Sequence, residues 1–184
     1  MKNTICFFVI TLLLGGSLQA QKFFTREGKV SFFSETPVEN IEAHNGKATS
    51  VVDAETGKME FAILIKAFQF EKALMQEHFN ENYMESSTYP KATFKGQVDN
   101  WDSVNLSADG RYPVTVSGDM TIHGVTQPVT AEGTFTVENG KVSAASTFNL
   151  KVADYDIEIP SVVRDNIAKS VRVDVDLDYE PLKG

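Results

Sequence analysis

The side chains with the widest chemical repertoire in this chain are its histidines, because imidazole titrates near neutral pH and binds metals. There are three, His44, His78 and His123, and no pair has the spacing of a zinc motif such as H-x-H or H-E-x-x-H. We expect His123, which ends an alternating segment just before Gly124, to hydrogen-bond the backbone of a turn. A catalytic base at His78 or His123 remains an alternative, because folding can bring a distant polar partner into reach.

The acidic residues show no catalytic arrangement. Asp174, Asp176 and Asp178 are two residues apart and so share one face of a strand. Several oxygen ligands on one face are compatible with calcium, but this alternation is typical of the solvated outside of a sheet. The chain also has no G-x-S-x-G element and no glycine-rich phosphate loop. We therefore predict no catalytic residue, no metal site and no cofactor, and that the protein is not an enzyme.

Composition indicates a globular, acidic chain of 184 residues. Hydrophobic residues make up 42% of it and charged residues 23%, which is enough apolar material for a core. Lys and Arg number 17 against 25 Asp and Glu, so the formal net charge is −8. Phosphate backbones and anionic lipid surfaces repel such a chain, which argues against nucleic-acid partners and against membrane docking by charge. The 13 phenylalanines suit a large apolar interior.

The N-terminus has the pattern of a secretory signal peptide, residues 1–20. A positively charged start precedes an apolar run over residues 5–14, and Ala20 offers a small residue for cleavage before Gln21. About ten apolar residues are too few to cross roughly 30 Å of hydrocarbon, and no second long apolar run follows. We expect a secreted or periplasmic protein without stable membrane insertion, with residues 21–184 as a single domain that lacks cysteine.

Alternation of apolar and polar residues dominates the rest of the chain and predicts strands with one buried face. It is clearest over residues 171–179, where the odd positions are apolar and the even positions are charged. A slip of one residue would bury three aspartates, so the register of this strand is well determined. Asn139-Gly140, between two alternating segments, predicts a tight hairpin. About eight antiparallel strands joined by short turns predict an all-β fold, either a meander that closes on itself or a sandwich.

Residues 71–84 break the alternation and predict a short helix, because apolar residues recur there at spacings of three to five. Pro90 ends any helix before it. Such a helix either covers one end of a barrel or fills part of its core. Small residues interrupt the inward faces of the strands, which either leaves a tunnel or eases strand curvature. These small residues are Gly96, Gly118, Ala131, Gly133 and Ala144.

Several segments resemble the YceI-like family. The most specific is residues 118–129, G-D-M-T-I-H-G-V-T-Q-P-V, which resembles the family signature G-x-L-T-I-H-G-V-T-x-P-V. Residues 75–79 and 89–94 look like the helix of that family and the Y-P-x-x-x-F start of its next strand. Further support comes from residues 28–32, residues 148–150 and the final alternating strand. The resemblance covers roughly residues 22–180, nearly all of the expected domain.

The resemblance implies a lipocalin-like antiparallel β-barrel of about eight strands, with a short helix near one end, that takes a long polyisoprenoid lipid into its lumen. Family members have been associated with isoprenoid quinones and polyprenyl lipids. This chain departs from the family in the helix, where Met75-Gln76-Glu77-His78-Phe79 lacks the basic residue of the usual pattern. That departure favours a neutral isoprenoid quinone or a fatty-acyl ligand over a polyprenyl pyrophosphate.

The predicted function is non-enzymatic binding, transport or storage of a long-chain isoprenoid or similar amphiphilic lipid. The alternative from another class is a protein-interaction module whose barrel is solidly packed, and pairing into a homodimer stays open. Phe68 and Phe70 fall out of phase with Ile65, so either a bulge lies between them or one set faces outward. The predicted ligand-binding residues are Phe32, Phe61, Ile63, Ile65, Phe68, Phe70, Leu74, Met75, His78, Phe79, Phe94, Val98, Met120, Ile122, Phe135 and Phe148.

Overall fold

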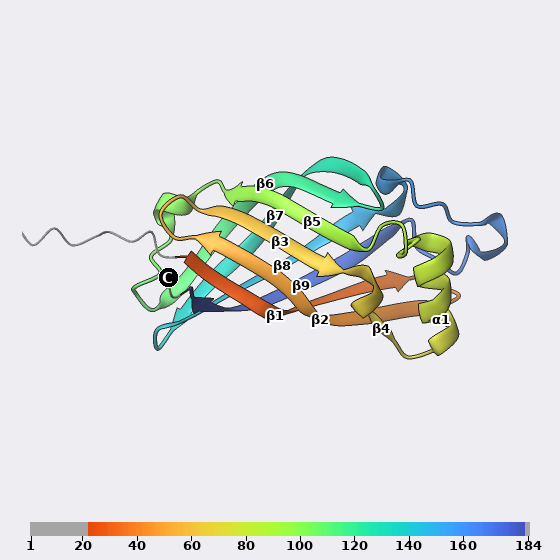
Figure 1. Cartoon of the computed structure of the whole chain (residues 1–184), viewed down its shortest axis with the longest axis horizontal. Coiled ribbons are helices and arrows are strands. Elements are labelled where there is room, and N and C mark those ends of the chain that lie inside the picture. Colours follow the sequence, from red (N-terminus) through yellow and green to blue (C-terminus); the bar gives the residue numbers. More distant parts are fainter. Residues whose placement is uncertain (1–21, 183–184) are drawn as a thin grey trace, which may run out of the picture.

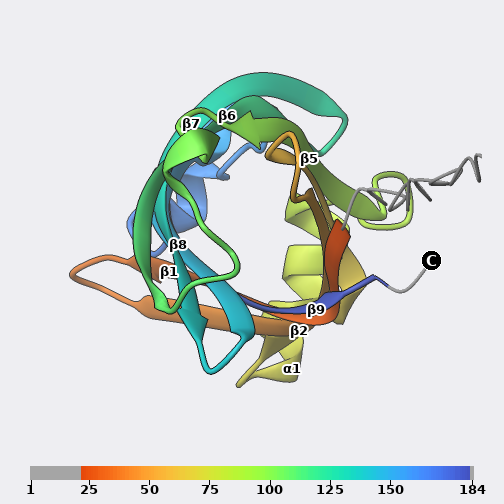
Figure 2. The ribbon, with the colours of Figure 1, turned by 90° about the vertical axis from the view of Figure 1, so that its left-hand side faces the viewer.

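The computed structural model describes residues 22–182, so the predicted signal peptide lies outside the described residues. Nine antiparallel strands in this part of the chain form one sheet, in the order β1-β9-β8-β7-β6-β5-β3-β2-β4. A further pairing between β1 and β2 closes the sheet into a barrel (Figures 1 and 2). Because β4 has two residues, the wall consists of eight long strands. The predicted lipocalin-like barrel is confirmed.

The long strands follow one another as a meander with one interruption, between β3 and β5. The strands are β1 (Lys22–Glu35), β2 (Asn40–Asp53), β3 (Lys58–Leu64), β4 (Gln69–Phe70), β5 (Lys91–Val98), β6 (Gly110–Ile122), β7 (Val125–Glu138), β8 (Lys141–Lys151) and β9 (Ser170–Pro181). The helical elements are α1 (Ala73–His78), the π-helix η2 (Phe79–Tyr83) and the 3-10 turns η1 (Ile65–Ala67), η3 (Trp101–Ser103), η4 (Val152–Tyr155) and η5 (Ser161–Val163). No helix within residues 22–182 is both long and apolar enough to cross a membrane.

Two-residue turns join three consecutive strands. Asn139 and Gly140, with φ of 51° and 74°, connect β7 to β8, as the sequence predicts. His123 and Gly124, with φ of 51° and 78°, connect β6 to β7 in the same way. Both turns have positive φ at both central residues, which matches the twist of antiparallel strands. His123 is therefore a turn residue itself rather than the last residue of a strand.

The segment between β3 and β5 places a helix across one end of the barrel (Figure 1). The prediction of a helix in residues 71–84 is confirmed, and it comprises α1 followed by the π-helix η2. The 3-10 turn η1 separates β3 from β4 and resets the alternation of side chains. Ile65, Phe68 and Phe70 therefore all reach the barrel interior although their spacing does not fit one strand.

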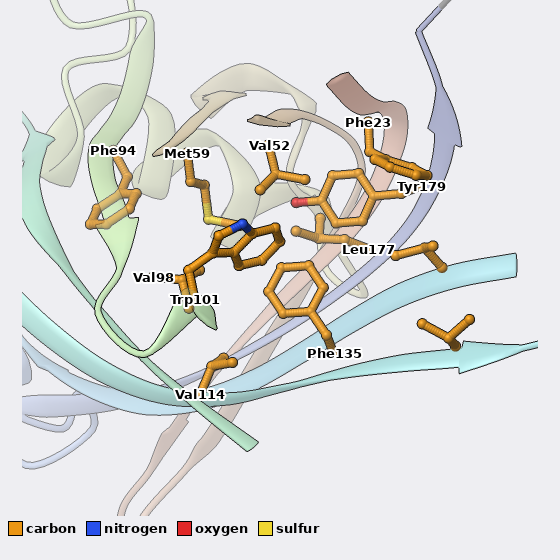
Figure 3. Close-up of a cluster of buried hydrophobic side chains, with 12 residues drawn as sticks. Phe23, Val52, Met59, Phe94, Val98, Trp101, Val114, Phe135, Leu177 and Tyr179 are labelled. Atoms are coloured by element: carbon orange, nitrogen blue, oxygen red, sulfur yellow. The ribbon is translucent and has the colours of Figure 1, made fainter. Parts of the chain in front are cut away.

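The opposite end of the barrel is filled by a cluster of large side chains, which we call the packed end (Figure 3). Trp101 enters from η3, and its indole N–H donates a hydrogen bond to the carbonyl of Ala54 at 3.0 Å. Tyr179 pairs with the hydroxyl of Ser50 at 2.7 Å. The buried members of this cluster are Phe23, Val52, Met59, Phe94, Val98, Trp101, Val114, Phe135, Val137, Val142, Leu177 and Tyr179.

Two of the small inward residues make room for an aromatic ring. Gly96 on β5 and Gly118 on β6 are paired across the two strands. The ring of Phe94 lies over both, since a Cβ on Gly96 or Gly118 would approach Phe94 Cζ to 2.5 or 2.8 Å. These glycines therefore do not open a tunnel at their level of the barrel. They let Phe94 lie flat against the wall, where it separates the packed end from the space below α1.

Candidate functional site: an apolar cavity beneath α1

The half of the barrel nearest α1 encloses a cavity of about 330 Å³. Its floor includes Phe61, Phe94 and Met120, which also pack against the cluster at the packed end. Its wall is formed by the inward faces of the strands, and α1, η2 and residues 152–167 border it at the end of the barrel. The volume lies within the range of small-molecule sites, roughly 300–1,000 Å³. The barrel is thus hollow at one end and solid at the other.

Most of the predicted ligand-binding residues line this cavity, and their role in binding stays a prediction. They come from β1, β3, β5, β6 and β8 and from the segment that carries α1. They are Phe32, Phe61, Ile63, Ile65, Phe68, Phe70, Met75, His78, Phe79, Phe94, Met120, Ile122 and Phe148. The out-of-phase pair Phe68 and Phe70 belongs to the lining because of the turn η1.

Three predicted residues lie elsewhere. Leu74 is 62% exposed, because Met75 and His78 occupy the face of α1 that turns toward the barrel. Val98 and Phe135 do point inward, but they are buried in the packed end. These three residues lie outside the cavity lining, and their role in ligand binding stays a prediction. Alternation identifies an inward side chain, and it carries no information on whether that level of the barrel is filled.

The sequence reasoning also missed part of the lining. The inward residues of β9, Val171, Val173 and Val175, contribute to the wall, and their alternation was a signal that could have identified them. The segment between β8 and β9 gave no such signal, because it is irregular and contains two 3-10 turns. It contributes Val152, Ile157, Ile159, Val163, Asn166 and Ile167.

Four phenylalanines hold the helical segment against the barrel wall. Phe79, where α1 passes into η2, contacts the rings of Phe32, Phe68 and Phe70 at centroid distances of 5.4, 5.7 and 5.0 Å. Phe32 in turn contacts Phe68 and Phe70 at 5.4 and 5.8 Å. Aromatic pairs of this kind contribute about 0.5–1.5 kcal/mol each beyond burial. We call these four residues the phenylalanine cluster. It forms both a side of the cavity and the attachment of α1.

His123 fastens a second segment over the cavity. Its Nδ1 lies 3.2 Å from the backbone carbonyl oxygen of Tyr155 in η4, which can only accept, so Nδ1 carries the proton. Nε2 has no hydrogen-bond partner among the described residues and lies 3.7 Å from Glu85 Oε2. Burial, and secondarily the charge of Asp154, raises the pKa of Tyr155, which packs with Ile157 beside the cavity. His123 does not line the cavity, and its position supports the expected bond to a backbone group.

His44 forms a hydrogen-bonded chain on the outer face of the barrel. Its Nδ1 is 2.7 Å from Ser31 Oγ and its Nε2 is 2.9 Å from Glu42 Oε1. Hydroxyl, imidazole and carboxylate are the groups of a hydrolytic triad. The imidazole is 58% exposed, however, and these residues do not line the cavity beneath α1.

The cavity surface is almost wholly apolar, and its polar groups lie at few places. Its polar lining residues are Ser34, Glu39, His78, Tyr83, Thr93 and Asn166. Burial raises the pKa of Tyr83, so its phenol stays neutral across the physiological range. The residues described contain no group of three or more His, Cys, Asp or Glu side chains placed to hold a metal ion. Such a surface favours an apolar guest.

A closed antiparallel barrel with one solid end and one apolar cavity defines a lipocalin-like protein. The chain belongs to the YceI-like family, whose domain model matches residues 21–179. A UPF0312 protein of Vibrio parahaemolyticus is 29% identical over 108 residues, which is 55% of this chain and 50% of that protein. A UPF0312 protein of Pseudomonas putida strain W619 is 32% identical over 111 residues, with the same shares. The chain spans about half the length of these curated relatives.

Solved structures show the same fold at low sequence identity. A polyisoprenoid binding domain from Saccharophagus degradans, implicated in plant cell wall breakdown, superposes with a TM-score of 0.76 at 18% identity. That comparison covers 89% of this chain and 99% of the other. BcnA of Burkholderia cenocepacia superposes with a TM-score of 0.69 at 17% identity, over 83% of this chain and 96% of the other. At these identities the likeness establishes the fold.

Proposed function

We propose that this protein binds a long-chain isoprenoid or a similar amphiphilic lipid in the cavity beneath α1 and carries or stores it. The observation that carries the proposal is the cavity itself, whose surface is almost wholly apolar and which is bordered by a helical segment at the end of the barrel. A relative of the same fold is described as a polyisoprenoid binding domain. The alternative of a solidly packed interaction module predicts no internal cavity, so the structure favours the lipid-binding proposal.

The energetics favour a long tail. Each buried methylene contributes about 0.8 kcal/mol, while association costs on the order of 4–15 kcal/mol. For a tail of about ten carbons, the free energy gained by burial therefore only slightly exceeds the free-energy cost of association. A longer chain reaches useful affinity through apolar contacts alone, which suits a lining with few polar groups.

The same lining supports binding rather than catalysis. Among the described residues the cavity contains one histidine, His78, and one carboxylate, Glu39. The lining, as far as residues 22–182 form it, includes no lysine or arginine to hold a pyrophosphate. We therefore propose a non-enzymatic role and an uncharged head group, such as that of a quinone or a neutral acyl derivative. Export through the signal pattern of residues 1–20 is part of the proposal, and N-terminal sequencing of the secreted protein tests it.

Native mass spectrometry of the purified protein, followed by organic extraction, tests the proposal directly. We expect a stoichiometric added mass and a long-chain lipid in the extract. A protein that carries no added mass, and that takes up neither quinones nor fatty-acyl compounds on titration, would contradict the proposal. The mass of the free protein also reports whether it pairs with a second copy.

A matched pair of variants locates the binding site. Ile122→Glu places a charge in the cavity. Thr121→Glu places the same charge on the preceding residue of β6, which lies outside the lining. A buried unpaired carboxylate is costly, so we expect Ile122→Glu to abolish lipid uptake while Thr121→Glu retains it. Circular dichroism checks that both variants fold. Unchanged uptake by a folded Ile122→Glu protein would place the lipid elsewhere.

A further inference from the structure

The polar groups of the cavity are not evenly spread, and three of them are tied together at one place. Ser34 lies near the end of β1, Glu39 in the loop before β2, and Asn166 in the segment that precedes β9. The amide of Asn166 donates from Nδ2 to Glu39 Oε2 at 3.2 Å. The backbone N–H of Ala168 donates to Ser34 Oγ at 2.8 Å. These two bonds hold residues 166–168 against the end of β1.

This group offers a head group both hydrogen-bond acceptors and donors. The Glu39 carboxylate only accepts. Asn166 uses one amide N–H on Glu39, which leaves its second N–H to donate and its carbonyl oxygen to accept. Ser34 is 2% exposed, so it presents its hydroxyl within the cavity wall rather than to solvent. A guest that meets this group gains hydrogen bonds when its head group is polar, whether that head group donates or accepts.

The charge of this group is negative on the cavity side. Glu39 is the one carboxylate of the described lining, and its side chain is 29% exposed. Lys72 Nζ is 3.5 Å from Glu39 Oε1, but Lys72 is 63% exposed and does not belong to the lining. Water screens the lysine, whereas the apolar wall strengthens the field of the carboxylate toward the cavity. A second carboxylate or a phosphate at this place meets a like charge.

We propose that Glu39 and Asn166 form a head-group subsite that selects lipids with uncharged polar heads and excludes anionic ones. The class of ligand is a lipid with a neutral head group, such as a long-chain alcohol, a primary amide or a quinone, in contrast to a fatty acid or a polyprenyl phosphate. This inference rests on the proposed lipid binding, and it adds which end of the lipid is recognised and by which atoms. Glu39 is the specificity-determining residue, and Asn166 holds its carboxylate in place.

A series of probes with one tail and different heads tests the subsite. Oleyl alcohol, oleamide, oleate and the headless octadecene are titrated into the delipidated protein, each in competition with one fluorescent alkyl probe. We expect the alcohol and the amide to bind at least about tenfold more tightly than oleate. Glu39→Gln keeps the shape and removes the charge, so oleate then binds within about threefold of the alcohol.

Lys72→Gln is the matched control, because it removes the charge that pairs with Glu39 from the solvent side. We expect it to retain or widen the preference for the alcohol. If oleate binds best and Lys72→Gln weakens it, the head group pairs with the lysine and the inference is wrong. Equal affinities for all four probes would also overturn it, with cavity binding intact. If octadecene and the other probes all fail to bind, the proposed function itself fails.

Discussion

The packed end and the cavity of this barrel are built from the same strands with the same alternation, yet one is solid and the other hollow. At the packed end Trp101 enters from η3 and contacts Phe135, which stacks on Tyr179, and these rings fill the lumen. Near α1 four of the inward phenylalanines gather in the phenylalanine cluster, and space is left beside them. The difference supports a division of the barrel in which stability is concentrated at the packed end and the proposed binding takes place at the other end.

The boundary between the two regions is a layer of shared side chains. Phe94 lies over Gly96 and Gly118, and Phe61 and Met120 contact both the cluster at the packed end and the cavity. A guest that enters beneath α1 therefore stops at this layer. The division makes separate predictions for the two ends, because a substitution at one end leaves the contacts of the other in place.

The largest expected effect distinguishes two inward phenylalanines. Phe135 is 1% exposed in the packed end, so Phe135→Ala should lower the free energy of unfolding by about 3–5 kcal/mol. Phe148 is half-buried and lines the cavity, so Phe148→Ala should cost less than about 2 kcal/mol and weaken lipid binding. Urea unfolding and lipid titration measure both quantities. Equal losses of stability in the two variants would show that the two ends are not separate.

The attachment of α1 gives the next comparison. Phe79→Ala removes three ring contacts of the phenylalanine cluster, and we expect bound lipid to leave about tenfold faster. Leu74→Ala, on the same helix but exposed, should leave the release rate unchanged. Stopped-flow transfer of a fluorescent lipid to acceptor vesicles measures the rate. A similar acceleration by both variants would mean that general destabilisation of α1, rather than the cluster, controls release.

Tyr179 makes the stability of the packed end depend on alkaline pH. Burial raises the pKa of its phenol above the ordinary value of 10.0, and the hydrogen bond with Ser50 opposes this only in part. The folded protein keeps the phenol neutral, while the unfolded chain ionises it near pH 10. The stabilisation is therefore complete below about pH 10 and is lost above it, by about 1.4 kcal/mol per pH unit.

Tyr179→Phe isolates the contribution of Tyr179 to the pH dependence of stability. Burial also raises the pKa of Tyr83 and Tyr155, but the pH dependence that these two residues cause is the same in the variant. Urea unfolding of both proteins between about pH 8 and 11, on either side of the ordinary tyrosine pKa, gives the free energy of unfolding at each pH. The slopes of the two pH profiles are then compared. The variant should be less stable at pH 8 by about 1 kcal/mol, since it loses the bond to Ser50. Parallel pH profiles would show that Tyr179 ionises equally easily in the folded state.

The smallest effect concerns the turn between β2 and β3. Asp53 Oδ1 accepts hydrogen bonds from the backbone N–H groups of Thr56 and Glu55, both at 3.0 Å. The bond from Thr56 is the main cause that lowers the pKa of Asp53. This stabilisation is present above the ordinary pKa of about 4 and disappears as the pH falls through the lower, folded-state value. We expect Asp53→Asn to lose slightly less stability than the unchanged protein as the pH falls. Thermal unfolding between about pH 2 and 6, a range around the ordinary pKa of aspartate, measures this difference.

Much of the architecture could be predicted because local patterns and the tertiary fold agree. The odd positions of residues 171–179 all turn inward on β9, and Asn139-Gly140 forms the expected tight turn. The helix before Pro90 is present as well. In each case a short-range signal is sufficient, since side chains of a strand alternate and a two-residue turn needs positive φ.

The site could be predicted only in part, because its residues are chosen by longer-range packing. Phe135 and Phe148 both lie in segments of alternating apolar residues. Phe135 belongs to a packed core because Trp101 contacts its ring from another loop. Residues 152–167 contribute to the cavity lining, but their sequence has no periodicity from which this position could be predicted. Glu39 and Asn166 are far apart in sequence and meet only when the last loop folds over β1.

By itself, then, the sequence determined the strands, their inward faces, the turns and the membership of a family, since these depend on alternation and on a signature of adjacent residues. The tertiary structure decided which inward residues enclose space and which fill it. It also decided that η1 turns Phe68 and Phe70 into the lumen, and that a carboxylate and an amide face the apolar cavity together. Those features depend on where separate loops and turns come to lie around the barrel, and packing between distant segments leaves no mark in the local pattern.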